Sequence, residues 1–144
     1  MYYTIYTSTP RKPISIEALN EIVSHSKSKN AELGITGILL GIENKYLQYI
    51  EGPEEAVKNL IKKIKMDSRH YDMVQWVTGF TKERSFEKWS MASWMLSKTE
   101  LESLTAQEDF QNFLNNPSNE ELQSKKFIEM MNGLLKTWIE KNKD

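Results

Sequence analysis

Short runs rich in β-branched and aromatic residues recur along the chain, and several of them alternate apolar with polar positions. Such runs predict β-strands when turn-forming residues separate them. Five segments fit this description: residues 2–8, 35–40, 46–51, 73–80 and 89–96. The second and third are separated only by a short turn-forming segment, which predicts a hairpin between them.

Two segments between these strands have apolar residues at helical spacing. The first follows Ser15, a helix-capping residue, and its apolar stripe ends before the polar run of residues 24–30. The second begins at Pro53, with Glu54 and Glu55 where the helix dipole favours acidic residues. The order β-α-β-β-α-β-β resembles an α+β ferredoxin-like sandwich with one strand added. That topology places the first and third strands side by side at the centre and both helices on one face.

Beyond residue 97 the apolar residues recur only at helical spacing. The pattern predicts a short helix, a break at residues 115–119 and then a second helix. The second helix has this apolar stripe: Leu122, Phe127, Ile128, Met131, Leu134, Leu135 and Trp138. We therefore expect one domain at residues 1–97 and two additional C-terminal helices at residues 98–144, packed into the same compact unit.

Composition narrows the classes of function. Nineteen Lys and Arg against 20 Asp and Glu give a formal net charge of -1, which argues against nucleic acid as a partner. The chain has no cysteine and only two histidines, so we expect no metal site. No apolar run approaches the roughly 18 residues of a membrane span. The N-terminus begins directly with a strand-like segment and lacks the regions of a signal peptide, so we expect a soluble, cytoplasmic protein without a membrane partner.

Four features could carry chemistry, and each also has an ordinary structural explanation. Tyr6 could be a core aromatic, and Gln48 could be a core amide whose donors and acceptor are satisfied. Asn30 could be a helix C-cap ahead of Gly34. Trp89 and Met91 lie two residues apart on the last predicted strand, so both side chains are expected on one face, toward Gln48.

These residues fall within five ordered motifs. The motifs are Tyr6-Thr7-Ser8; Asn30 followed by Gly34-Ile35-Thr36-Gly37; Tyr46-Leu47-Gln48-Tyr49-Ile50-Glu51-Gly52-Pro53; Asp67-Ser68-Arg69-His70; and Phe86-Glu87-Lys88-Trp89-Ser90-Met91. In content and spacing they resemble the BLUF family, domains that sense blue light using flavin. The resemblance covers roughly residues 2–96. Two positions depart from the family pattern, because Lys29 replaces a common Asn and Lys63 replaces a common Arg.

The resemblance implies a blue-light photoreceptor that binds flavin non-covalently, with the ring slotted between the two helices. FAD is the expected cofactor, with FMN and riboflavin as alternatives. The implied cofactor-binding residues are Tyr6, Asn30, Gln48, Lys63, Asp67, Arg69 and His70. The implied photoactive residues are Tyr6, Gln48, Trp89 and Met91. Excited flavin is expected to take an electron and a proton from Tyr6, and their return is expected to leave the Gln48 amide rearranged.

The resemblance also implies how the signal leaves the domain. The last strand leads into the C-terminal helices, and short stand-alone members are expected to act on a separate protein partner, which this sequence does not name. It also leaves open whether the chain forms a homo-oligomer. Two other functions are compatible with the same predicted fold. An acylphosphatase-type hydrolase needs an anion-binding loop, but the loop around Arg11 lacks the necessary glycines. A cofactor-free interaction module would be colourless, whereas a flavin sensor is yellow.

Overall fold

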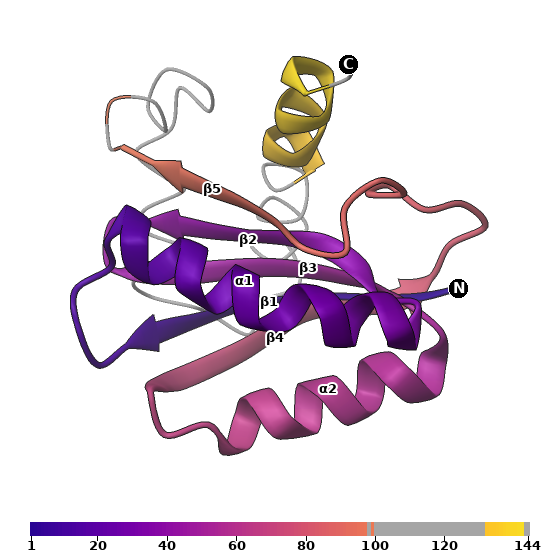
Figure 1. Ribbon diagram of the computed structural model, residues 1–144, viewed down its shortest axis with the longest axis horizontal. Coiled ribbons are helices and arrows are strands. Elements are labelled where there is room, and N and C mark those ends of the chain that lie inside the picture. Colours follow the sequence, from indigo (N-terminus) through magenta and orange to yellow (C-terminus); the bar gives the residue numbers. More distant parts are fainter. Residues whose placement is uncertain (98, 100–131, 143–144) are drawn as a thin grey trace. The chain divides into compact units, whose positions relative to one another are not determined.

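The computed structural model describes residues 1–97, 99 and 132–142, and the chain divides into two compact units, Met1–Leu96 and Ser97–Asp144. The first unit alternates strands and helices in the predicted order (Figure 1). Its elements are β1 (Tyr2–Pro10), α1 (Ile16–Leu33), β2 (Thr36–Ile42), β3 (Lys45–Gly52), α2 (Glu54–Met66), β4 (His70–Phe80) and β5 (Ala92–Leu96).

The five strands form one sheet in the order β4-β1-β3-β2-β5. β1 pairs antiparallel with both β3 and β4, and β2 pairs antiparallel with β3. The added strand β5 pairs parallel with β2 at one edge of the sheet. This arrangement confirms the ferredoxin-like α+β fold. It also confirms that the first and third strands are neighbours, and their register places Tyr6 directly opposite Gln48.

Both helices lie on the same face of the sheet, as Figure 1 shows, but over different strands. α1 packs on β2 and β5, where Leu19 and Val23 join Leu39 in a buried cluster. α2 packs on β1 and β3, where Val57 and Ile61 join a second buried cluster. The line between the two helices therefore passes over the middle of the sheet.

Two predicted strand starts were wrong, and the structure also defines where α1 ends. β4 begins at His70 rather than at residue 73, because His70 and Tyr71 pair with the end of β1. α1 continues past the polar run of residues 24–30 to Leu33, and its C-cap is Gly34 in the left-handed conformation at φ 71°. β5 begins at Ala92 rather than at residue 89.

In the second unit the structure describes a helix at residues 132–141. Leu134, Leu135 and Trp138 are buried, as expected for members of the predicted apolar stripe. The remaining predicted members, and the first predicted C-terminal helix, lie outside the described residues. Within the described part of the chain, no helix is both long enough and apolar enough to cross a membrane.

Candidate functional site

A tyrosine and a glutamine form a buried hydrogen bond at the centre of the sheet. Tyr6 of β1 donates its phenolic proton to Oε1 of Gln48, the residue opposite it on β3. Both side chains are almost inaccessible, with 4% and 8% of their surface exposed. Tyr6 belongs to the cluster beneath α2, which also contains Val57 and Ile61. The pair therefore faces the helices.

The other end of the Gln48 amide contacts a methionine. Gln48 Nε2 donates to Sδ of Met91 at 3.3 Å, and Met91 is 2% exposed in the cluster beneath α1. Sulfur is a weak acceptor, so this contact holds the amide less firmly than the bond to Tyr6. Rotating the amide would turn its NH₂ group toward the phenol and its carbonyl toward the sulfur. Gln48 thus has two orientations, which differ in whether the amide NH₂ group donates to the Met91 sulfur or to the Tyr6 oxygen.

Burial disfavours ionisation of the Tyr6 phenol. The apolar surroundings raise the pKa of its phenol well above the ordinary value of 10.0, and the negative charge of Asp67 adds to this shift. Tyr6 therefore stays neutral well into the alkaline range, and its phenol can donate a hydrogen bond to Gln48.

Asn30 links α1 to the segment that precedes β5. Its side chain is buried within the helix at 3% exposure, and its Nδ2 donates to the backbone carbonyl of Ser90 at 3.1 Å. Its own backbone carbonyl accepts from Ile35 N at 2.8 Å. Asn30 is therefore not the C-cap residue; it ties the end of α1 to the neighbour of Met91.

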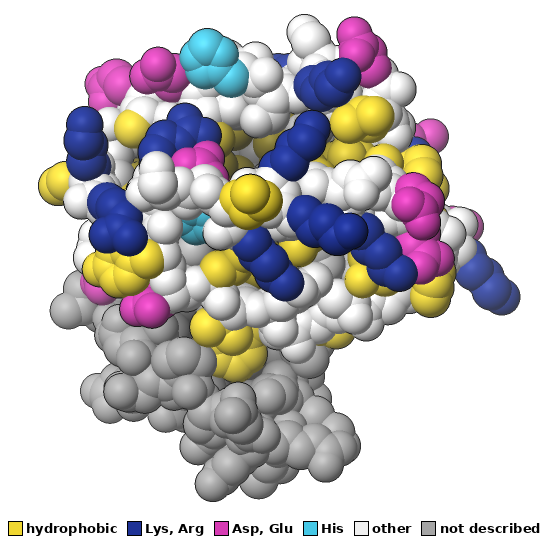
Figure 2. Space-filling view, turned by 90° about the horizontal axis from the view of Figure 1, so that it is seen from below, with side chains coloured by type: hydrophobic (Ala, Val, Ile, Leu, Met, Phe, Trp, Pro, Cys, Tyr) yellow, Lys and Arg dark blue, Asp and Glu magenta, His cyan; other side chains and the backbone are white. Residues whose placement is uncertain are grey.

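The remaining candidates gather where α2 ends. Arg69 donates to Asp67, with Nη2 at 2.6 Å from Oδ2, and this bond lowers the pKa of the Asp67 carboxyl to about 2. His70 Nε2 lies 2.6 Å from the carbonyl of Ile64. Among the described residues, His70 Nδ1 is the one buried side-chain nitrogen or oxygen that lacks a hydrogen-bond partner. Lys63 is exposed in the last turn of α2. Figure 2 shows several Lys and Arg side chains on the face of the molecule seen from below.

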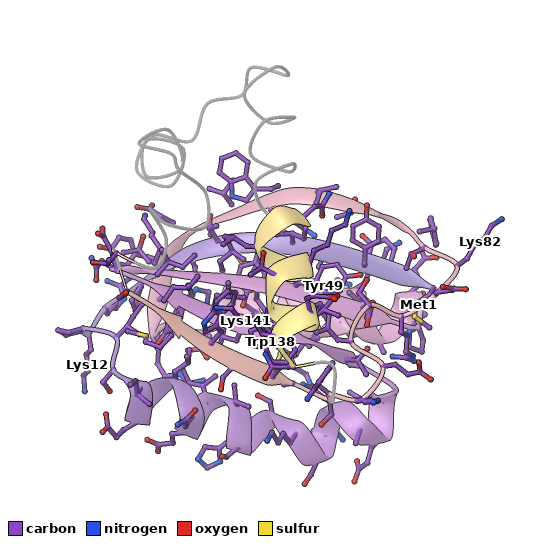
Figure 3. All side chains as sticks on the ribbon, turned by 90° about the horizontal axis from the view of Figure 1, so that it is seen from above. Met1, Lys12, Tyr49, Lys82, Trp138 and Lys141 are labelled. Carbon is purple, nitrogen blue, oxygen red and sulfur yellow. The ribbon has the colours of Figure 1, made fainter. Side chains whose placement is uncertain are left out.

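Trp89 does not share a face with Met91, so that part of the sequence prediction was wrong. Residues 89–91 precede β5 and do not alternate as a strand does. The Trp89 ring lies edge-on to Phe86, with 6.3 Å between ring centroids, whereas Met91 contacts Gln48. Phe86 in turn packs against Tyr49, which follows Gln48 on β3 and therefore faces the other side of the sheet. Figure 3 labels Tyr49 in a view from above.

Sequence reasoning missed one buried acidic residue. Glu51 is fully buried and accepts four hydrogen bonds. Its signal in the sequence was an acidic residue directly after Ile50 in a predicted central strand, where an unpaired carboxylate is costly.

Comparison with known proteins identifies the family to which the chain belongs. The family model described as sensors of blue light using FAD matches residues 1–92. The β subunit of photoactivated adenylate cyclase from Euglena longa is 36% identical over 61% of this chain, and the blue light- and temperature-regulated antirepressor BluF from Escherichia coli K12 is 36% identical over 60%. The matched segments span only 10% and 22% of those two relatives.

Among solved structures, the dark state of the BLUF protein BlrB superposes with a TM-score of 0.71 at 26% identity. That match covers 94% of this chain and 96% of BlrB. The ordered motifs, the sheet topology and the family model agree. The chain belongs to the BLUF family, and it is a flavin-binding sensor of blue light rather than an acylphosphatase-type hydrolase.

Proposed function

We propose that this sensor responds to light through the Gln48 amide, with Tyr6 as its hydrogen-bond donor in the dark and Met91 as the first residue that moves. The observation that carries the proposal is the chain of contacts from the Tyr6 hydroxyl through Gln48 to the Met91 sulfur. All three side chains are buried, so any change in one of these contacts alters the packing of the next.

The residues around the contacts of Tyr6, Gln48 and Met91 fit a flavin between the helices. Apolar clusters beneath α1 and α2 provide surfaces for a flat aromatic ring. Asn30 and Gln48 offer amide donors and acceptors for the polar edge of such a ring. The unpaired His70 Nδ1 gives a further site for a polar contact, and Arg69 and Lys63 offer positive charge. We propose these residues, with Tyr6 and Asp67, as the flavin-binding set.

A bound flavin supplies a chromophore that, once excited by blue light, accepts an electron and a proton. Tyr6 would supply that proton, because its phenol is neutral and already donates a hydrogen bond to Gln48. When the phenol no longer donates, Gln48 Oε1 loses its partner and the amide is free to turn. A net hydrogen bond is worth about 1 kcal/mol. This is enough to shift the balance between two amide orientations without unfolding the domain.

Met91 transmits the change to β5. The sulfur receives its hydrogen bond from the Gln48 nitrogen, and β5 begins at the next residue, Ala92. We propose that the signal continues along β5 toward the C-terminal extension and from there to a separate protein partner. We also propose FAD as the flavin, since the family is described by that cofactor. Catalysis and antirepression are named for much longer relatives, and we assign neither to this chain.

Two substitutions test the residues. Tyr6→Phe and Gln48→Leu should each retain bound flavin but lose the light-induced red shift of its absorption, because one removes the phenolic proton and the other the switching amide. Tyr3→Phe is the matched control, since Tyr3 is also on β1 but stacks on Tyr49. A wild-type red shift in either site variant would refute the assignment.

A further inference from the structure

Glu51 has a complete set of hydrogen-bond donors although it is fully buried. Its Oε1 accepts from the Tyr49 hydroxyl at 2.9 Å and from the backbone N–H of Ser85 at 2.8 Å. Its Oε2 accepts from the Thr36 hydroxyl and from the backbone N–H of Phe86, both at 2.7 Å. A carboxylate offers about four acceptor positions, so these four donors satisfy the group.

Two of these donors belong to the segment between β4 and β5. Arg84, just before Ser85, donates from Nη1 to the Thr36 hydroxyl at 2.9 Å, which adds a third tie in the same place. Phe86 is fully buried and packs on Tyr49, with ring centroids 5.4 Å apart. By contrast, Lys82, a little earlier in the segment, is exposed and points away from the sheet in Figure 3. Residues 84–86 are therefore anchored on the face of the sheet opposite the helices.

The segment between β4 and β5 contacts β3 at its other end as well, where Met91 lies against Gln48. Gln48 and Glu51 are three residues apart, so their side chains project to opposite faces of the sheet. Between the two anchors, the carbonyl of Trp89 accepts from Gly37 N at 3.2 Å. Residues 84–91 thus cross from one face to the other, beginning at Glu51 and ending with Met91 against Gln48.

We propose that Glu51 is a positioning residue for the light response. By fixing residues 84–86, it prevents the preceding loop from absorbing the movement of Met91, and the movement passes forward into β5. This inference rests on the proposed roles of Gln48 and Met91. A buried charge with satisfied partners adds little to stability compared with a well-packed apolar group, so an anchoring role gives a reason for a carboxylate here.

The test compares light and dark amide hydrogen exchange of residues 92–96 in the flavin-loaded protein. Glu51→Gln places an NH₂ group where a backbone N–H now donates. Freeing an amide from a charged acceptor should speed its exchange at Ser85 or Phe86 by roughly tenfold or more. We expect this variant to keep the flavin red shift but to lose the light-dependent exchange difference in β5. Thr36→Val removes the Thr36 and Arg84 contacts to the same cluster. It should likewise keep the flavin red shift and lose the light-dependent exchange difference in β5.

Two controls separate positioning from simple destabilisation. Glu87→Gln makes the same charge change at an exposed position of the same segment. Leu47→Ala removes a fully buried apolar side chain of β3, and so destabilises the same strand without removing a hydrogen bond to Glu51. Both should retain the light-dependent difference in β5.

The inference about Glu51 is overturned if Glu51→Gln keeps the exchange difference, or if Leu47→Ala loses it as well. If Glu51→Gln does not fold, Thr36→Val decides by the same criterion. Absence of any exchange difference in wild-type β5 also overturns it. A red shift that survives Gln48→Leu refutes the proposed function instead, so the two failures are distinguishable.

Discussion

The hydrogen bond between Tyr6 and Gln48 predicts a specific pattern of stability in a double-mutant cycle. Tyr6→Phe leaves the buried Gln48 carbonyl oxygen without its donor, which should lower the free energy of unfolding by about 1–3 kcal/mol. Gln48→Leu leaves the Tyr6 hydroxyl unpaired in an apolar cluster and should have a cost of the same order. Each single substitution therefore leaves one buried polar group without its hydrogen-bond partner.

The double variant removes both polar groups, and replacing both partners with apolar groups can be nearly neutral. Its loss of stability should be smaller than the sum of the two single losses, with a coupling free energy of about 1–2 kcal/mol. Urea unfolding should be measured after flavin removal, because bound ligand adds its own stabilisation. The cycle of Tyr3→Phe with Gln48→Leu is the control, and it should be additive because Tyr3 stacks on Tyr49 instead. Additivity within about 0.5 kcal/mol in the Tyr6 cycle would refute the reasoning.

Three further changes have defined outcomes. Asn30→Ala should reduce flavin occupancy after identical purification, whereas Asn20→Ala, which removes an exposed contact to β5, should not; equal occupancy would contradict the assignment. Met91→Ala should preserve most of the red shift but abolish light-dependent hydrogen exchange in the helix at residues 132–141, and unchanged exchange there would exclude this route. The pKa of Asp67, about 2, is below its ordinary 3.8, so its ion pair stabilises the fold above pH 4 and is lost as pH falls toward 2. The stability of Asp67→Asn, measured by urea unfolding, should therefore fall less over that range than that of wild type, by under about 1 kcal/mol because the Arg69 partner is 78% exposed.

Local patterns were sufficient for the order of the elements and for the central pairing. The alternation in β3 and the turn before it defined the hairpin, and the fold topology then placed Tyr6 opposite Gln48. The ends of elements that pair with distant segments were harder to predict from the sequence. The start of β4 follows from pairing of His70 with Pro10, some sixty residues earlier, and no periodicity within β4 signals this contact.

The environment of Met91 depended on similar distant contacts. Spacing by two suggested that Trp89 and Met91 share a face, but the backbone at Trp89 accepts a bond from Gly37 and its ring turns toward Phe86. The course of this segment follows from the Glu51 contacts, which a single sequence does not reveal. Asn30 illustrates the same limit, since a polar run in the sequence gave no sign of its buried contact with Ser90.

The absorption spectrum of the purified protein before and after blue light shows whether the chain senses light through flavin and Gln48. We expect a yellow protein with the bands of oxidised flavin, a small shift to longer wavelength under blue light, and full reversal in the dark. The chain contains no cysteine, so no cysteinyl adduct can form. A colourless protein, or bleaching that persists in the dark, would contradict a sensor that works by rearranging the hydrogen bonds of Gln48.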